Sequence, residues 1–208
     1  MKRIFIITVM LAALQSCGTI CPAATLQEEA VTVSQKYVGQ VVERTNNNDH
    51  PQITKWLKEI GLPPGLAWCA AAAVGIFREA AGNLGIQSPL PKMGRVASIW
   101  DYCKSRELRF RIFRPDEAML LGLRPGDLAI WRHGKGVAKN FDGHIEINVA
   151  QANSRQFHSD GGNTVPSNAG GQREQSKQDA NKGGYYRRTR GLGFGTSFAV
   201  EGFIRIRS

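Results

Sequence analysis

Cysteine is scarce in this 208-residue chain, which has four, and no two of them form a Cys-x-x-Cys pair. So few cysteines exclude a small scaffold built on disulfides. The chain also has no His-Glu-x-x-His motif and no tight group of His and Asp, so we expect no metal site. No glycine-rich loop matches a nucleotide-binding fingerprint. We therefore expect a protein that works without a cofactor.

Acidic residues are outnumbered, with 17 Asp and Glu against 27 Lys and Arg, which gives a formal net charge of +10. A positive excess of this size favours an anionic partner. Arg187, Arg188 and Arg190 cluster beside two tyrosines, and we interpret this group as a solvated basic surface. The rest of the composition, 42% hydrophobic and 21% charged, is ordinary for a globular protein. The length fits one domain with a short appendage.

Long apolar runs are also missing, with one exception near the N-terminus. Lys2 and Arg3 precede an apolar run over residues 4–14, and small residues follow it. This order is typical of an export signal, and the run is too short to cross a bilayer as a helix. We interpret residues 1–24 as a signal peptide and residues 25–208 as the working domain. Loss of Lys2 and Arg3 with the signal lowers the net charge from +10 to +8.

The signal can end in two ways. Pro22-Ala23-Ala24 fits a signal-peptidase site, whereas Leu14-Gln15-Ser16-Cys17 resembles a bacterial lipobox. Lipidation of Cys17 would anchor the protein to a membrane, and we expect no other membrane contact. Either route takes the domain to the periplasm, the cell envelope or the outside. Export argues against nucleic acid as the anionic partner, and no nucleic-acid-binding module is recognisable. We expect a monomer.

The pattern of the domain predicts helices first and strands afterwards. Apolar spacing predicts helices over residues 26–45, 51–60, 69–82 and 95–106. Strands are expected over residues 127–132, 144–150, 154–159, 184–189 and 200–207. This order indicates an α+β fold with an antiparallel sheet. Two long polar loops, 133–142 and 161–183, are of a size that carries function or is disordered.

Cys69 is the first candidate for chemistry. It stands where the loop Gly65-Leu66-Ala67-Trp68 turns into an apolar helix. Free N–H groups at a helix N-terminus stabilise a thiolate, which is the nucleophile of acyl transfer. By itself, Cys69 fits a small buried core residue better than a nucleophile. Cys103, on the apolar face of the fourth helix, is expected to be a buried thiol.

His144 favours the interpretation of Cys69 as a nucleophile over its interpretation as a core residue. It begins a predicted strand directly after Gly143. A cysteine with a downstream histidine is the pattern of a nucleophile and its general base. The other three histidines, His50, His133 and His158, are interpreted as surface or structural residues.

A third group is expected to orient the imidazole. Asn163, in Asp160-Gly161-Gly162-Asn163-Thr164, offers a side-chain carbonyl, and Asp160 is the carboxylate alternative. The same five residues also fit a simple turn.

Taken in order, these pieces resemble the CHAP cysteine amidase/peptidase family of peptidoglycan hydrolases, which are relatives of the NlpC/P60 peptidases. The resemblance covers about residues 28–208. It is carried by Gly65-Leu66-Ala67-Trp68-Cys69-Ala70-Ala71, similar to "G-x-x-W-C-A-A", Arg124-Pro125-Gly126-Asp127-Leu128, Gly143-His144-Ile145, Gly162-Asn163-Thr164, the stretch 185–190 and Gly202-Phe203-Ile204-Arg205.

The resemblance implies a papain-like fold, with helices carrying Cys69 packed on an antiparallel sheet carrying His144. It implies cleavage of an amide bond in peptidoglycan through a Cys69 thioester, with His144 as base and then acid, and Asn163 or Asp160 as orienting group. Trp68 and Glu146 are expected to contact the substrate. The bond cleaved lies in the peptide stem, in a cross-bridge or between muramic acid and L-alanine.

Two departures from the family pattern matter. Gly161 stands where relatives often carry an acid, and Glu146 stands where many carry a small residue. Alternate strand residues share a face, so His144 and Glu146 should be neighbours. Loss of the acid at position 161 leaves open an alternative, a non-catalytic wall-binding protein with the same fold.

Overall fold

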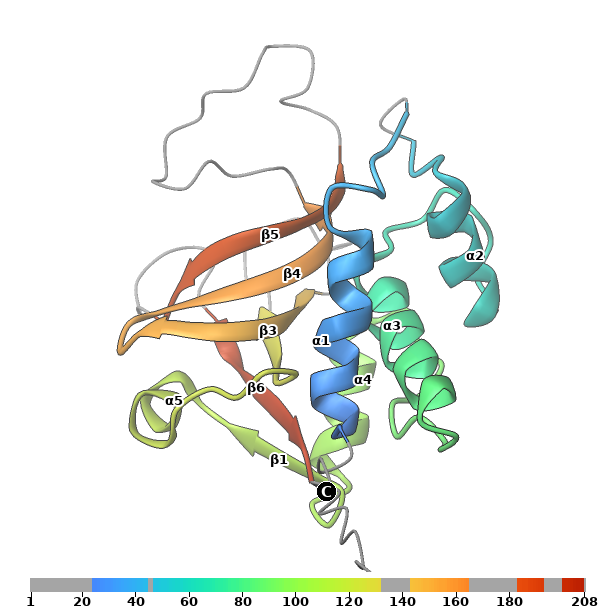
Figure 1. Ribbon diagram of the computed structural model, residues 1–208. Helices are drawn as coiled ribbons and strands as arrows, with labels where there is room; N and C mark the ends of the chain where they lie inside the picture. The colour runs from blue at the N-terminus through green and yellow to red at the C-terminus, as the bar shows by residue number, and fades with distance from the viewer. Residues whose placement is uncertain (1–23, 45–46, 132–142, 165–182, 193–199, 208) are drawn as a thin grey trace, which may run out of the picture.

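The structure is a computed structural model that describes residues 24–44, 47–131, 143–164, 183–192 and 200–207. Within these residues, five helices lie beside one six-stranded antiparallel sheet (Figure 1). The predicted α+β fold is confirmed. The elements are α1 (Leu26–Tyr37), α2 (Pro51–Glu59), α3 (Cys69–Asn83), α4 (Val96–Lys104), β1 (Phe110–Phe113), α5 (Pro115–Leu121), β2 (Leu128–Trp131), β3 (His144–Asn153), β4 (Gln156–Thr164), β5 (Gly184–Gly191) and β6 (Val200–Ile206).

The strands lie in the order β1-β6-β2-β3-β4-β5, and each neighbouring pair is antiparallel. The chain from β2 to β5 runs back and forth through neighbouring strands. The last strand, β6, instead returns to lie between β1 and β2. The C-terminal strand therefore joins β1 to the rest of the sheet.

The main core lies between the sheet and the helices α1 to α4. Eleven of the fifteen residues of α3 are buried, so this helix is apolar on nearly every side, as its sequence predicts. Two strand isoleucines, Ile145 and Ile147, face it with Leu128 and Ile130 of β2. A second, smaller cluster on the other sheet face contains Ala118 of α5 with Trp131, Phe157 and Phe203. Side chains of the sheet thus alternate between two cores.

Helix α1 shows why the predicted boundary at residue 45 is wrong. It begins with a capping box between Thr25 and Glu28, as the acidic first turn favours. It ends at Tyr37, because Gly39 takes a left-handed conformation with φ of 70° and turns the chain. The following residues form a short bridge to the sheet, with Val42 opposite Gly184.

Two elements were missed in the sequence, β1 and α5. Both are short, and the adjacent apolar residues Ile112 and Phe113 break the alternation of β1. Helix α5 has only seven residues, with Pro115 in its first turn. Strand β4 extends to Thr164, so residues 161–164 belong to the sheet and not to a loop. The predicted loop 133–142 and most of the loop 161–183 lie outside the described residues.

The turn Arg124-Pro125-Gly126-Asp127 ties three elements together. Gly126 has φ of 83°, and a Cβ there would lie 2.4 Å from the Cβ of Gln27 in α1. Arg205 of β6 donates two hydrogen bonds to the buried Asp127 carboxylate, at 2.8 and 2.6 Å. This motif therefore fixes β2 against β6 and α1.

No helix in the described part of the chain is long and apolar enough to cross a membrane.

Candidate active site

Cys69 is the first residue of α3, and its thiol lies at the positive end of the helix. The capping position is Trp68, which offers no side-chain hydrogen bond to the first turn. The leading N–H groups of α3 therefore act on the sulfur region without a competing side-chain acceptor. Cys69 is 6% exposed, and it is a free thiol.

Trp68 anchors this helix start. Its ring is completely buried and stacks on Trp56 with centroids 5.9 Å apart. Its indole Nε1–H donates a hydrogen bond to Glu43 at 3.2 Å. Gly162 of β4 passes so close that a Cβ there would lie 2.2 Å from the ring. Trp68 thus sets where α3 begins relative to β4, and its side chain is not open to a substrate.

His144 opens β3 and is brought to Cys69 by the fold, 75 positions along the chain. It is 9% exposed, and its ring lies near enough to the Cys69 side chain for the two to interact. Gly143 makes this placement possible, since it has φ of 115° and its Cα passes close to the Trp131 carbonyl. A Cβ at position 143 would lie 2.4 Å from that oxygen. The Trp131 ring lies beside the imidazole, with centroids 5.6 Å apart.

Glu146 holds the other side of the imidazole. His144 Nε2 lies 2.9 Å from Glu146 Oε1, as the alternation along β3 predicts. The remaining ring nitrogen, Nδ1, is thereby left for the sulfur. Glu146 is fully buried and also accepts hydrogen bonds from Ser159 Oγ at 2.5 Å and Arg190 Nε at 2.9 Å. A second Arg190 nitrogen, Nη2, contacts Oε1.

The space for this carboxylate comes from Gly161. A Cβ at position 161 would lie 2.4 Å from Glu146 Cγ. An acid at position 161 and Glu146 in its present place would therefore exclude one another. The volume that a side chain at position 161 would need is filled by the side chain of Glu146.

The charges of this cluster shift two titrations. Burial alone would lower the pKa of His144, but its hydrogen bonds and charge interactions with Cys69 and Glu146 raise that pKa to about 9. Burial opposes ionisation of Glu146, yet hydrogen bonds from Arg190 and His144 bring its pKa well below the ordinary value. At neutral pH, the site holds an imidazolium between a carboxylate and a sulfur.

Among the hydrogen bonds of the described residues, none joins Asp160 or Asn163 to His144. Asp160 accepts hydrogen bonds from Arg187 at 2.8 and 3.0 Å and from Ser34 of α1 at 2.7 Å. It therefore faces α1, on the side of the sheet away from Glu146. Asn163 lies in a bulge of β4 with φ of 56°, and within the described residues its side chain makes no hydrogen bond. Neither residue is placed to orient the imidazole here.

The residues missed in the sequence are Ser159 and Arg190. The arginine group on β5 was interpreted as a solvated surface, whereas Arg187 binds Asp160 and Arg190 binds Glu146. The signal was present in the alternation of β5, which sends residues 188 and 190 to the same face. Which acid each would meet depends on the register between β4 and β5, which the sequence does not specify.

The remaining polar candidates lie elsewhere. His50 caps α2 through Nδ1, which accepts from the Gln52 N–H, and His158 contacts Thr189. His133 lies outside the described residues. Cys103 is buried as expected, and burial raises the pKa of its thiol to about 12. No group of three or more metal-ligating side chains occurs in the part of the chain that the structure describes.

Comparisons with known proteins leave the family open. No protein-family model and no curated protein sequence matches the chain. A solved structure that the chain is similar to is described as a wild-type endolysin, LysIME-EF1, with a TM-score of 0.48 and 16% sequence identity. The match covers 86% of this chain and 63% of the endolysin chain. The function of the protein must therefore be inferred from Cys69, His144 and Glu146 themselves.

Proposed function

We propose that this protein is an exported cysteine hydrolase that cleaves an amide bond in peptidoglycan. The observation that carries the proposal is that His144 lies between Cys69 and Glu146, where α3 and β3 begin. A thiol at a helix N-terminus, beside an imidazole that a buried carboxylate holds, is the arrangement of an activated nucleophile.

The reaction proceeds by acyl transfer. The Cys69 sulfur attacks the amide carbon, and His144 gives its proton to the amine as the C–N bond breaks. A thioester remains on Cys69, and the amine leaves. The neutral His144 then takes a proton from water, whose oxygen attacks the thioester carbon. The C–S bond then breaks, the carboxylic acid departs, and the sulfur is released beside the protonated His144, as at the start of the cycle.

Glu146 fills the orienting role in this proposal, in place of Asn163 or Asp160. Its contact with Nε2 fixes the ring so that Nδ1 faces the sulfur, and its charge stabilises the imidazolium. Arg190 and Ser159 keep the carboxylate ionised and in place. They act through Glu146 and are positioning residues.

Peptidoglycan is proposed as substrate on different grounds from the chemistry. Residues 1–24 have the order of an export signal, which takes the domain to the compartment of the wall. The motifs around Cys69 and His144 resemble those of wall amidases and peptidases. The wall also carries anionic groups, which the exported domain with its net charge of +8 would meet favourably.

The test is digestion of purified peptidoglycan from several wall types by the wild-type chain, Cys69→Ala and Cys103→Ala, with products identified by mass spectrometry. Cys103 is the matched control, because it is also a buried free thiol but lies in α4. We expect products from the wild type and Cys103→Ala and none from Cys69→Ala, and the product masses would name the bond.

Two outcomes would contradict the proposal. Products that persist in Cys69→Ala would exclude the thiol as nucleophile. Binding to the walls without products in any variant would favour the alternative, a non-catalytic wall-binding protein.

A further inference from the structure

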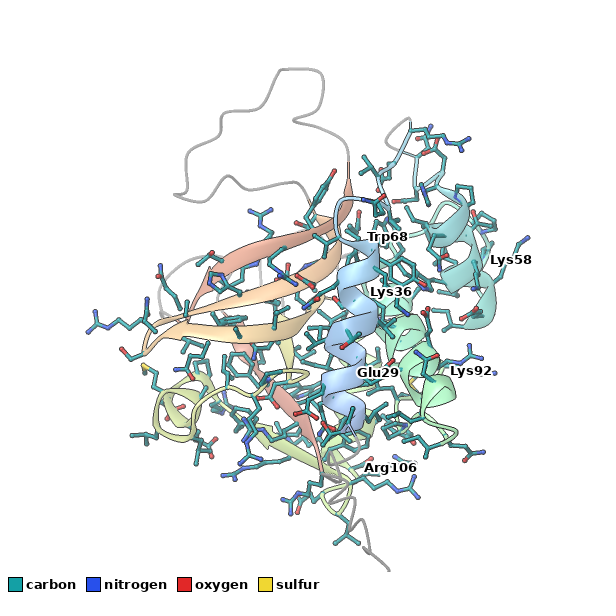
Figure 2. All side chains as sticks on the ribbon, viewed as in Figure 1. Glu29, Lys36, Lys58, Trp68, Lys92 and Arg106 are labelled. Carbon is teal, nitrogen blue, oxygen red and sulfur yellow. The ribbon has the colours of Figure 1, made fainter. Side chains whose placement is uncertain are left out.

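Helix α1 begins and β6 ends at the same end of the molecule (Figure 1). A group of basic side chains lines the hollows there. Figure 2 shows Arg106 at this end and Trp68, the neighbour of Cys69, at the opposite end of α1. We call this surface the basic end. It contains Lys104, Arg106, Arg109, Arg111, Arg114, Arg124 and Arg207. It is separate from the candidate active site.

Two adjoining hollows shape the basic end. One, of about 570 Å³, is lined by Arg111, Arg124 and Arg207 together with the first residues of α1. The other, of about 520 Å³, shares Arg111 and Arg207 and adds Lys104. The same two arginines therefore stand between both hollows, where a ligand on either side would meet them.

The sheet brings these like charges together. Arg111 of β1 lies directly opposite Arg205 of β6, and Arg207 follows two residues later. Like charges directly opposite one another in a sheet are destabilising. Asp127 compensates Arg205, but in the described ranges no acidic side chain forms an ion pair with Arg111 or Arg207. Glu28 lines one hollow, and Glu107 and Glu117 line the other, but the basic side chains of the basic end outnumber them. The excess positive charge favours an anion that comes from outside the domain.

Leu108 distinguishes between kinds of anion. It is 94% exposed and lies in the turn between α4 and β1, between Glu107 and Arg109 and two positions after Arg106. An apolar side chain among cations suits the boundary of a bilayer, where phosphates meet the cations and acyl chains meet the leucine. A dissolved polyanion would offer Leu108 no apolar partner.

The chain enters the domain at the same end. Thr25, which caps α1, lines the larger hollow. Cys17, the residue of the lipobox-like sequence, precedes Thr25 by eight positions, a span of about 29 Å at most. A lipid on Cys17 would hold the basic end close to a bilayer surface.

We propose that the basic end docks on a bilayer containing anionic phospholipids, with Leu108 entering the headgroup boundary. Docking in this orientation turns the opposite end, with Trp68 and Cys69, away from the membrane. The inference does not depend on the proposed hydrolase activity, because none of its residues belongs to the candidate active site.

The experiment measures co-sedimentation of the full chain with vesicles of phosphatidylcholine alone or mixed with phosphatidylglycerol. The variant Arg111→Gln/Arg124→Gln/Arg207→Gln removes three charges from the basic end. The control variant Lys55→Gln/Lys58→Gln/Lys92→Gln removes three charges from exposed positions elsewhere. The apolar N-terminal segment is the same in all proteins, so differences report on the domain. Circular dichroism melts verify that both variants fold.

We expect the wild type and the control to bind anionic vesicles at least about tenfold more tightly than the basic-end variant, with binding that weakens as salt rises. Equal loss in both triple variants, or equal binding to neutral vesicles, would overturn the proposal. Binding to DNA or polyphosphate without binding to anionic vesicles would overturn the assignment to lipid.

A second variant, Leu108→Trp, tests the orientation. With anionic vesicles carrying brominated acyl chains, its added fluorescence should shift to the blue and be quenched, relative to the wild type. No quenching while the protein is bound would show that another surface faces the bilayer.

Discussion

Glu146 has no exposed surface, and side chains from three strands donate hydrogen bonds to it or share a proton with it. A buried carboxylate is tolerated only when its charge is matched and its oxygens are occupied. His144 and Arg190 supply two cationic partners, and Ser159 a hydroxyl. At the scale of single residues, the site is therefore a charge network in which each member depends on the others.

Glu146→Gln removes the negative charge while preserving the size of the side chain. We expect hydrolysis to fall at least about 100-fold, because the imidazolium loses its counter-charge and its fixed orientation. Alkylation of Cys69 by iodoacetamide, followed peptide by peptide, provides a readout without substrate. Its pH profile should change in Glu146→Gln, whereas a purely structural role for Glu146 would leave the profile of the folded variant unchanged.

The raised pKa of His144 predicts how stability depends on pH. Its folded pKa of about 9 exceeds the ordinary 6.5, so the stabilisation is fully present below about pH 6.5 and is lost as pH rises through 9. Denaturant unfolding should show a loss of up to about 3 kcal/mol between pH 7 and pH 10 in the wild type. His144→Gln should lack this decline. Parallel pH curves for the two proteins would show that His144 is not the group responsible.

Much of the site could be predicted from local spacing. Cys69 after a loop, His144 after a glycine and Glu146 on the face of His144 all follow from helix starts and strand alternation. Arg190 and Ser159 could not be predicted, because their contacts depend on which residues β4 and β5 bring opposite one another. The positions of Asp160 and Gly161 on β4 were likewise invisible while 161–164 were interpreted as a loop.

Glycines at the ends and in the middle of strands let elements approach one another around the site. Gly143 passes the Trp131 carbonyl, Gly161 leaves room for Glu146, and Gly162 leaves room for the Trp68 ring. The glycines in Gly161-Gly162 are thus required by packing within a strand and not by a turn. At the scale of elements, β3, β4 and α3 can lie as close together as they do because these glycines have no side chain.

Gly161→Ala tests this spacing. The added Cβ would lie 2.4 Å from Glu146 Cγ, so the carboxylate must move away from His144. We expect a loss of about 1–3 kcal/mol in the free energy of unfolding and a loss of hydrolysis of at least about tenfold. Gly82→Ala in α3 is the control, because nothing lies within 4 Å of its added Cβ. Wild-type hydrolysis by Gly161→Ala would contradict the assigned place of Glu146.

Long elements were predicted better than short ones. Helices α2, α3 and α4 lie close to their expected ranges because several turns of apolar spacing define each of them. Strand β1 has four residues and helix α5 seven, too few for a period to stand out. The end of α1 depended on one backbone conformation, that of Gly39.

At the scale of the whole molecule, the last strand links two parts of the sheet. β6 pairs with β1 on one side and β2 on the other, so residues 200–206 join one segment more than 89 positions earlier in the chain and another about 70 positions earlier. Its anchor is the buried pair of Arg205 and Asp127, and Arg205 also donates to the Gly122 carbonyl at 2.8 Å. The sheet order that results was not predictable, because the sequence pattern does not say where a final strand inserts.

Asp127→Asn should destabilise the entire fold, because it leaves the Arg205 charge buried without its partner. We expect a loss of about 3 kcal/mol, measured by denaturant unfolding at neutral pH. Asp101→Asn, on the exposed side of α4, is the matched control and should change stability by less than about 0.5 kcal/mol. Similar losses in both variants would show that the pair does not anchor β6.

The placement of Glu146 on the strand of His144 has a consequence for how the site can be transferred and varied. An orienting acid on β4 would depend on the alignment of two strands, and a slip of one residue would separate it from the base. In the His144-Ile145-Glu146 tripeptide, the distance is instead fixed by the repeat of a single strand. The base and the acid are therefore held together within three consecutive residues of β3. Insertions in the turn between β3 and β4 leave their pairing intact.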